Sequence, residues 1–163
     1  MGGWQLNLLA TMHTGSPFTV TADGSSLNAP GSTQRADLVK SNVKINGGTK
    51  QYFDITAFRP VTAARFGTSS YNMLRGPGAG NLDASIFRSF VLPEHLSLQL
   101  RMESFNVTNT PHFGNPGSSV SSAVFDSSGN ITNPNGFGQI TSTSPISRSV
   151  DERNFRLGAK LIF

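Results

Sequence analysis

The chain has 163 residues, of which 13% are charged, and it carries a formal net charge of +4 with no cysteine. The missing cysteines exclude disulfide scaffolds, cysteine zinc sites and thiol nucleophiles, and no apolar run approaches the roughly 18 residues of a transmembrane helix. The basic residues are scattered singly along the sequence and form no patch, so we expect no nucleic-acid partner.

The first predicted strand covers residues 4–14 and ends at the turn signal Gly15-Ser16-Pro17. The residues between its apolar positions are polar, with Leu9 as the exception. An alternation with a period of two indicates a β-strand with one apolar face. The apolar positions are Trp4, Leu6, Leu8, Ala10 and Met12.

The second predicted strand covers residues 82–92 and carries one charge, Arg88, on its apolar face. An arginine that faces lipid at the bilayer midplane costs about 2–4 kcal/mol. The sequence leaves two solutions open: the side chain of Arg88 extends toward the membrane surface, or a bulge near Phe87 redirects the strand. The other positions of this face are Leu82, Ala84, Ile86, Phe90 and Leu92.

The third and fourth predicted strands cover residues 96–107 and 154–163, and a short turn at residues 93–95 precedes the third. Both strands alternate, and both carry charges on their polar faces. We favour cross-strand ion pairs along a solvated barrel wall over a charged lumen that guides substrate. The charged positions expected to face the lumen are Arg101, Glu103, Arg156 and Lys160.

Two long connections, residues 15–80 and 108–150, separate these strands. Structureless loops of this length argue against a compact soluble domain, whereas outer-membrane barrels combine long extracellular loops with short periplasmic turns. The sequence therefore predicts an all-β fold: an antiparallel meander of about four long strands with two long extracellular loops, the C-terminal part of a transmembrane β-barrel. The order of the loops directs the fourth strand toward the periplasm.

Four strands do not close a barrel, and an open sheet edge cannot lie in lipid. Residues 1–7 also lack the basic and apolar regions of a signal peptide. We therefore expect residues 1–163 to be the C-terminal segment of a longer barrel protein. A soluble β-sandwich binding module or adhesin is the alternative, suggested by the Ser-, Gly- and Asn-rich connections.

Several short motifs occur together along the chain. They are Arg75-Gly76-Pro77-Gly78, Asn81-Leu82-Asp83, Phe105-Asn106-Val107-Thr108-Asn109, Phe113-Gly114-Asn115-Pro116, Phe137-Gly138-Gln139-Ile140 and the terminal Leu161-Ile162-Phe163. In combination they resemble the C-terminal end of TonB-dependent receptors of the Oar-like type, over residues 4–163. The resemblance implies a barrel of about 22 strands, with the plug and the TonB-contacting segment near the N-terminus of the full-length protein.

The resemblance also implies roles for two sets of residues. The alternating residues before a terminal aromatic would be the signal that the barrel-assembly machinery reads: Phe155, Leu157, Ala159, Leu161 and Phe163. A loop turn would lead into a descending strand, with glycines that accept positive φ and a proline that fixes its own backbone angle: Arg75, Gly76, Pro77 and Gly78.

The expected partners are outer-membrane lipid, the assembly machinery, and the remaining strands and plug of the full-length protein, with TonB bound only through the N-terminal part. We expect no enzyme activity, cofactor or metal, because His13, His95 and His112 lack ligand spacing and no serine lies in a nucleophile motif. Five loop aromatics are expected to form small clusters that order the loops, in preference to binding carbohydrate or peptide: Tyr52, Phe53, Phe58, Phe66 and Phe113.

Overall fold

The structure is a computed structural model, and it describes residues 3–93, 95–144 and 151–163. The chain divides into two compact units, each described here by itself. We call them the sheet unit and the loop unit. The sheet unit contains Met1–His13, Ala79–His112 and Thr143–Phe163, and the loop unit contains Thr14–Gly78 and Phe113–Ser142.

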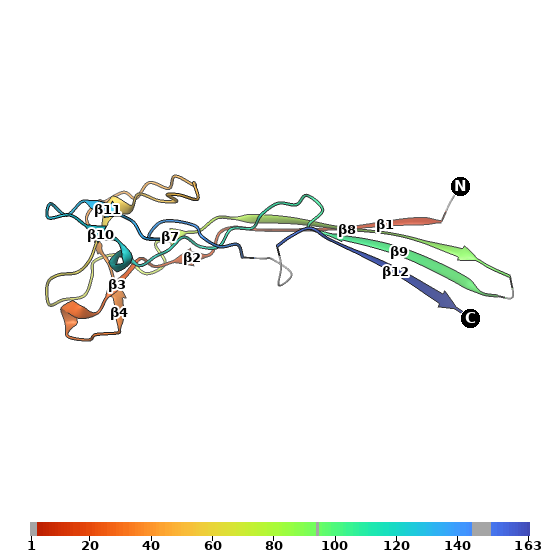
Figure 1. The fold of residues 1–163 in the computed structure, drawn as a ribbon, viewed down its shortest axis with the longest axis horizontal. Helices are drawn as coiled ribbons and strands as arrows, with labels where there is room; N and C mark the ends of the chain where they lie inside the picture. The colour runs from red at the N-terminus through yellow and green to blue at the C-terminus, as the bar shows by residue number, and fades with distance from the viewer. Residues whose placement is uncertain (1–2, 94, 145–150) are drawn as a thin grey trace. The chain divides into compact units, whose positions relative to one another are not determined.

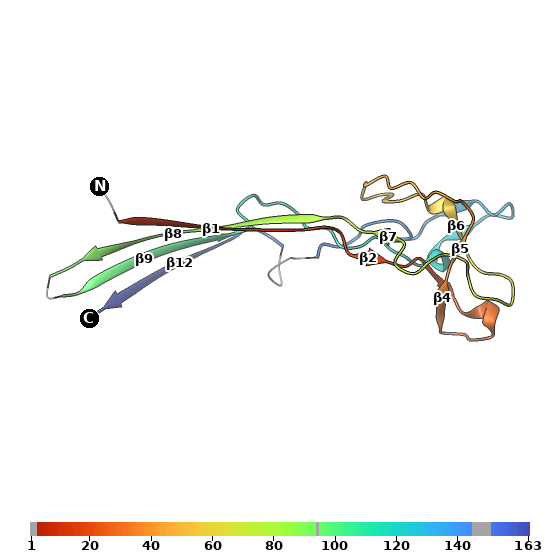
Figure 2. The same cartoon turned by 180° about the vertical axis from the view of Figure 1, so that it is seen from behind.

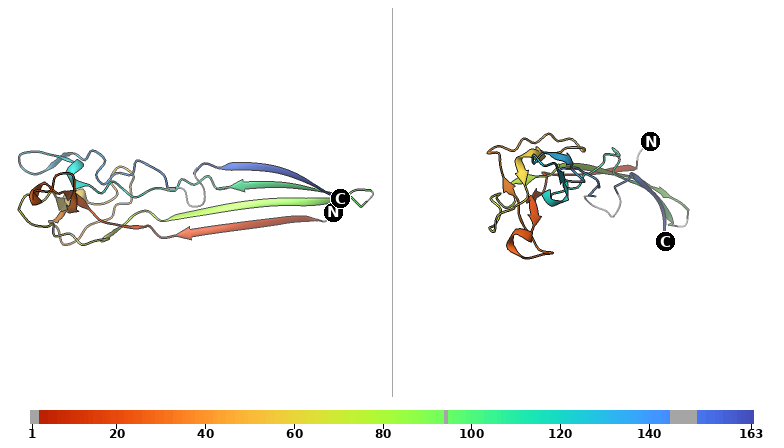
Figure 3. Two further views of the ribbon diagram at one scale, coloured as in Figure 1. Left: turned by 90° about the horizontal axis from the view of Figure 1, so that it is seen from below. Right: turned by 60° about the vertical axis from the view of Figure 1, so that its left-hand side comes forward.

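The sheet unit is built on four long strands, which lie side by side in the order β1-β8-β9-β12 (Figure 1). Every neighbouring pair is antiparallel, and the arrows of β1 and β9 point the same way in Figure 3. The all-β antiparallel meander predicted from the sequence is therefore confirmed. The strands are β1 (Trp4–His13), β8 (Ala79–Val91), β9 (Ser97–Phe105) and β12 (Asn154–Ile162).

Two strand ends differ from the expected bounds for identifiable reasons. Strand β8 begins at Ala79 instead of residue 82, because it stays paired with β1 up to the pair of His13 and Ala79. Strand β9 ends at Phe105 instead of residue 107, because Asn106 takes a left-handed conformation with φ of 47°. Left-handed backbone breaks a strand and starts a turn.

A short hairpin connects β8 to β9. The N–H of Leu92 donates to the carbonyl of Leu96 across 2.8 Å, and His95 has a positive φ of 64°. Glu94, in the predicted turn at residues 93–95, lies outside the described residues, as do residues 145–150 at the end of the second predicted loop. Among the described residues, no helix has the length and apolar character needed to cross a membrane.

The loop unit has one hydrophobic core of its own, where the sequence predicted only small clusters of aromatic side chains. Both long connections contribute to it, so they fold together and do not form separate loops. For example, the N–H of Thr21 donates to the carbonyl of Ser118 across 2.9 Å. The buried core residues are Phe18, Val20, Ala22, Ala36, Tyr52, Phe53, Ala57, Phe58, Val61, Leu74, Val120 and Phe137.

Short elements surround this core. Four two-stranded ladders pair β2 with β7, β3 with β4, β5 with β6 and β10 with β11. The strands are β2 (Pro17–Phe18), β3 (Thr21–Asp23), β4 (Thr33–Arg35), β5 (Asp37–Leu38), β6 (Phe58–Arg59), β7 (Leu74–Arg75), β10 (Val124–Phe125) and β11 (Ile131–Asn133). Three 3₁₀ turns complete the unit: η1 (Ser25–Leu27), η2 (Ile55–Ala57) and η3 (Val120–Ser122).

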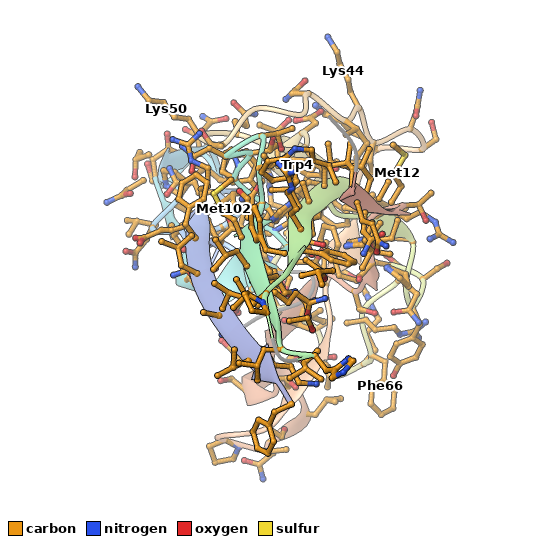
Figure 4. All side chains as sticks on the ribbon, turned by 90° about the vertical axis from the view of Figure 1, so that its right-hand side faces the viewer. Trp4, Met12, Lys44, Lys50, Phe66 and Met102 are labelled. Atoms are coloured by element: carbon orange, nitrogen blue, oxygen red, sulfur yellow. The ribbon has the colours of Figure 1, made fainter. Side chains whose placement is uncertain are left out.

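Phe53 lies at the centre of the aromatic core. Its ring meets Phe58 edge-on at 5.8 Å and Phe137 at 5.4 Å between centroids, a geometry that aromatic quadrupoles favour. The expected small clusters are therefore one shared core, which includes Tyr52, Phe53 and Phe58. Phe66, labelled in Figure 4, stays outside it and is 67% exposed.

Candidate functional site

The register of the sheet unit brings the apolar positions of all four strands onto one surface. Trp4 lies opposite Arg88, Leu6 opposite Ile86, and Ile86 opposite Met102. We call this surface the apolar face: the even-numbered residues of β1, β8 and β9 and the odd-numbered residues of β12. Trp4, Met12 and Met102 of this face are labelled in Figure 4.

The apolar face is open over much of its area. Leu8 is 63% exposed and Leu157 is 82% exposed, and soluble monomers rarely show a contiguous apolar surface of this kind. Strands of 9 to 13 residues match the length that a tilted strand needs to cross a bilayer. In a membrane barrel such a face meets lipid.

The residues expected to form the assembly signal lie on and just beyond β12, at one edge of the sheet, with β1 at the other (Figure 2). Their side chains alternate onto the apolar face, and Phe163, which follows the strand, is 99% exposed. Within the described residues, no strand pairs with the outer edge of β12 or of β1. The positions on β12 are Phe155, Leu157, Ala159 and Leu161.

The four charged residues expected to face a lumen all lie on the opposite, mainly polar face. The ion pair there runs along β9: Arg101 Nη2 lies 2.6 Å from Glu103 Oε1. Arg156 is opposite Glu103 in the register, but its guanidinium lies over the Phe105 ring, 5.3 Å from the centroid. Lys160 is opposite Gln99. Ion pairing on this face thus differs from the cross-strand pattern we expected, because residues two apart on a strand also share a face.

A buried polar cluster, which we did not predict from the sequence, links the ends of three strands. Asn106 is its centre and is 6% exposed. Its Nδ2 donates to the carbonyls of Thr110, at 3.0 Å, and Asp151, at 2.7 Å. Its backbone N–H donates to Asp83 Oδ1 at 2.9 Å, and Asn81 Nδ2 donates to the same oxygen at 2.8 Å. The cluster consists of Asn81, Asp83, Asn106, His112 and Asp151.

His112 is the buried histidine of this cluster, at 3% exposed. Its Nδ1 contacts the Asp151 carboxylate, and its Nε2 lies 3.0 Å from the carbonyl of Gly80. A carbonyl only accepts, so Nε2 carries a proton. The backbone N–H of His112 also donates to Asp151 Oδ2 at 2.7 Å. Asp151 is 39 residues away in the chain, so no motif spacing predicts this pair.

The polar cluster has a structural role, because its hydrogen bonds hold three segments of the sheet unit together. It joins the start of β8, the turn after β9 and the segment before β12, and its buried polar groups are satisfied by one another. The described residues contain no group of three or more His, Cys, Asp or Glu side chains arranged to hold a metal ion.

The predicted turn motif at residues 75–78 lies in the loop unit, and its glycines work differently from our expectation. Neither Gly76 nor Gly78 has a positive φ. Gly76 is needed for close packing instead: a Cβ there would lie 2.0 Å from Asn115 Oδ1. Its N–H donates to the carbonyl of Ser16 at 3.0 Å, and Arg75 Nη1 donates to the carbonyl of Gly15 at 3.2 Å. Pro77 lies between the two glycines.

Charged residues of the loop unit pair locally. Arg65 binds the carboxylate of Asp37 with two hydrogen bonds of 2.6 and 2.8 Å, and the N–H of Thr68 donates to it as well. These bonds from Arg65, aided by its charge, hold the pKa of Asp37 below its ordinary value. Lys40 pairs with Asp54 at 2.7 Å.

Comparison with known proteins identifies the family. The chain matches the family model described as "Outer membrane beta barrel domain" over residues 1–155. No curated protein and no solved structure gives a match. The match agrees with a sheet of long antiparallel strands that has one apolar and one mainly polar face. The chain therefore belongs to the outer membrane β-barrel domain family and resides in the bacterial outer membrane.

Proposed function

We propose that this chain forms part of the barrel wall and two extracellular loops of a TonB-dependent receptor of the Oar-like type. The main support is the sheet unit, whose strands β1 and β12 each have an outer edge that pairs with no strand of the described residues. Unpaired N–H and C=O groups on such edges cannot be satisfied by lipid. Further strands must therefore close the barrel, as in the large barrels that transport substrates across the outer membrane.

The order of connections supports the orientation. The connections from β1 to β8 and from β9 to β12 are long, and their residues build the loop unit, whereas β8 and β9 are joined by a short hairpin. Long connections of outer-membrane barrels are extracellular and short ones periplasmic. The segments of the loop unit are thus extracellular in this proposal, and β12 descends to the periplasm.

The polar face then lines the lumen. In this proposal Arg101, Glu103, Arg156 and Lys160 contact water or the plug of the full-length protein, which other parts of that protein supply along with the TonB contact. No catalytic residue or cofactor has a part in the proposal. The family match to an outer membrane β-barrel domain argues against the alternative of a soluble β-sandwich module.

Crosslinking to TonB in cells tests the proposal. We expect the tagged full-length gene product, produced in its native host, to be recovered from the outer membrane covalently joined to TonB. A product with its TonB-contacting N-terminal segment deleted is the matched control and should give no crosslink. A protein that shifts on gels after heating, as folded barrels do, but never crosslinks to TonB would refute the receptor role and leave the barrel intact.

A further inference from the structure

The apolar face carries one charged side chain among the described residues, Arg88, and the structure shows how it is accommodated. Strand β8 pairs without a bulge, from Ala79 to Arg88 with β1 and from Ala84 to Val91 with β9. Arg88 therefore stays on the apolar face, directly opposite Trp4 on one side and Leu100 on the other. The bulge that the sequence allowed near Phe87 is absent.

Two aromatic rings flank the guanidinium of Arg88. It lies 5.3 Å from the centroid of the Trp4 ring and 4.7 Å from that of Phe90. Cation–π contacts of this kind hold a guanidinium in place and leave its N–H groups available. No carboxylate of the described residues pairs with Arg88, whereas Arg101 on the other face has Glu103.

The position of Arg88 along β8 places it near one membrane surface. Arg88 lies three positions before Val91, the last residue of the strand, which corresponds to about 10 Å along the chain. With the usual tilt of barrel strands, the depth is roughly 8 Å. A charge is costly at the midplane but tolerated nearer the surface, and the long arginine side chain can extend from this level toward the phospholipid phosphates.

Arg88 does not line the nearby apolar groove itself, but Trp4, whose ring contacts Arg88, does. The groove has a volume of about 710 Å³. An acyl chain suits such a groove because all of its lining residues except Arg101 are apolar or glycine. The other apolar residues that line it are Ile86, Leu100, Met102, Leu157 and Ala159.

We propose that Arg88 and this groove form a binding site for one anionic phospholipid of the periplasmic leaflet. The guanidinium of Arg88 donates to the phosphodiester oxygens in the forked geometry that suits phosphate, and an acyl chain lies in the groove. Trp4 and Phe90 orient the guanidinium. The site is separate from transport, and it relies on the family and on the orientation in which the β8–β9 hairpin faces the periplasm.

Native mass spectrometry of the full-length gene product in detergent tests the site. We expect phosphatidylglycerol to bind about tenfold more tightly than phosphatidylcholine, because the choline of the latter competes with Arg88 for the phosphate. One charge-assisted hydrogen bond is strong enough to account for a ratio of this size. Arg88→Gln should remove this preference. Arg156→Gln, which alters the polar face and does not line the groove, is the matched control and should retain it.

Further variants separate the charge from the groove. Arg88→Lys keeps the charge but loses the forked geometry, so an intermediate preference is expected. Ala159→Trp fills the groove and should weaken both lipids without changing their ratio. If Arg88→Gln fails to fold, as judged by the gel shift on heating, the Ala159→Trp variant still tests the groove.

Three results would overturn the proposal. One is an unchanged preference for phosphatidylglycerol in folded Arg88→Gln. Another is displacement of the lipid by millimolar inorganic phosphate, since that would mean that the groove contributes nothing. The last is a wild-type protein that appears as a lipid-free dimer, because a second copy would then cover the apolar face.

Discussion

At the scale of single residues, the sheet unit depends on polar side chains that no local pattern identifies. Asn106 combines two functions: its left-handed backbone ends β9, and its side chain satisfies carbonyls of Thr110 and Asp151. Asparagine is among the few residues that adopt this conformation readily. The motif that contains Asn106 was visible in the sequence, but only its hydrogen-bond partners in the structure explain why an asparagine occupies this position.

We predict that Asn106→Ala destabilises the sheet unit by about 2–4 kcal/mol, because it leaves buried polar groups unsatisfied and strains the left-handed backbone. Asn106→Gly should cost less, since glycine removes the side-chain bonds but accepts the conformation. The temperature at which the full-length protein in detergent loses its heat-modifiable form measures both effects.

Asn109→Ala is the control for this comparison. Asn109 also has a positive φ, of 52°, but it is exposed and its side chain accepts one bond, from the N–H of Arg153 at 3.3 Å. Its replacement should cost clearly less than that of Asn106. Equal losses for Asn106→Ala and Asn109→Ala would show that the buried hydrogen bonds contribute little.

At the scale of elements, the four strands differ in how many neighbouring strands they pair with. Strands β8 and β9 have neighbours on both sides, whereas β1 and β12 are outer strands of the described sheet. Period-two alternation predicts each strand by itself, and here it gave all four. It does not predict register, and register alone puts Arg88 beside Trp4 and leaves Glu103 opposite Arg156.

The residues that alternate along β12 lead to a prediction for assembly. Deletion of Phe163, which is 99% exposed, should reduce insertion of the full-length protein into the outer membrane about tenfold or more, if the assembly machinery reads the terminal aromatic. One lost recognition contact of about 1.4 kcal/mol suffices for that factor. Quantitative immunoblots of outer-membrane fractions, with and without heating, measure the inserted form.

Phe163→Tyr is the matched control, since it keeps an aromatic ring at the last position and should insert normally. Ile162→Ala adds a second comparison, because Ile162 belongs to the opposite, mainly polar face of β12. Insertion that is unaffected by loss of Phe163 would contradict the assembly role of this residue.

At the scale of the whole molecule, the chain contains two units that rely on different stabilising forces. The sheet unit exposes apolar side chains that lipid must cover, whereas the loop unit buries its own aromatic core. The loop unit also contains the bidentate pair of Asp37 and Arg65. The stability of the loop unit in water should therefore respond to pH.

The lowered pKa of Asp37, caused chiefly by the hydrogen bonds from Arg65, sets the direction of this response. A carboxyl with a depressed folded-state pKa stabilises the fold above its unfolded pKa, about 4, and loses that contribution as the pH falls through the folded pKa. We predict that Asp37→Asn speeds hydrogen exchange of the loop-unit core a few-fold at pH 7. The difference should fade as the pH falls through the lowered folded-state pKa of Asp37.

Arg65→Gln checks the assignment to this pair. It should have an effect similar to that of Asp37→Asn at pH 7, and the double variant should add little to either, because both changes remove the same bonds. Additive effects of the two substitutions, or a difference that persists in acid, would assign the stabilisation to other contacts.

The sequence by itself determined the class of fold and the position of the long strands, because alternation with a period of two depends only on consecutive residues and not on which strands pair. It also identified the motifs that resemble large outer-membrane receptors. The sequence suggested that loop aromatics cluster, but not that the two connections share one core, because these residues follow no period. The pairing of His112 with Asp151 across 39 residues was not predicted either. Register, a shared core and long-range hydrogen bonds depend on which segments meet in space, and only the tertiary structure decides that.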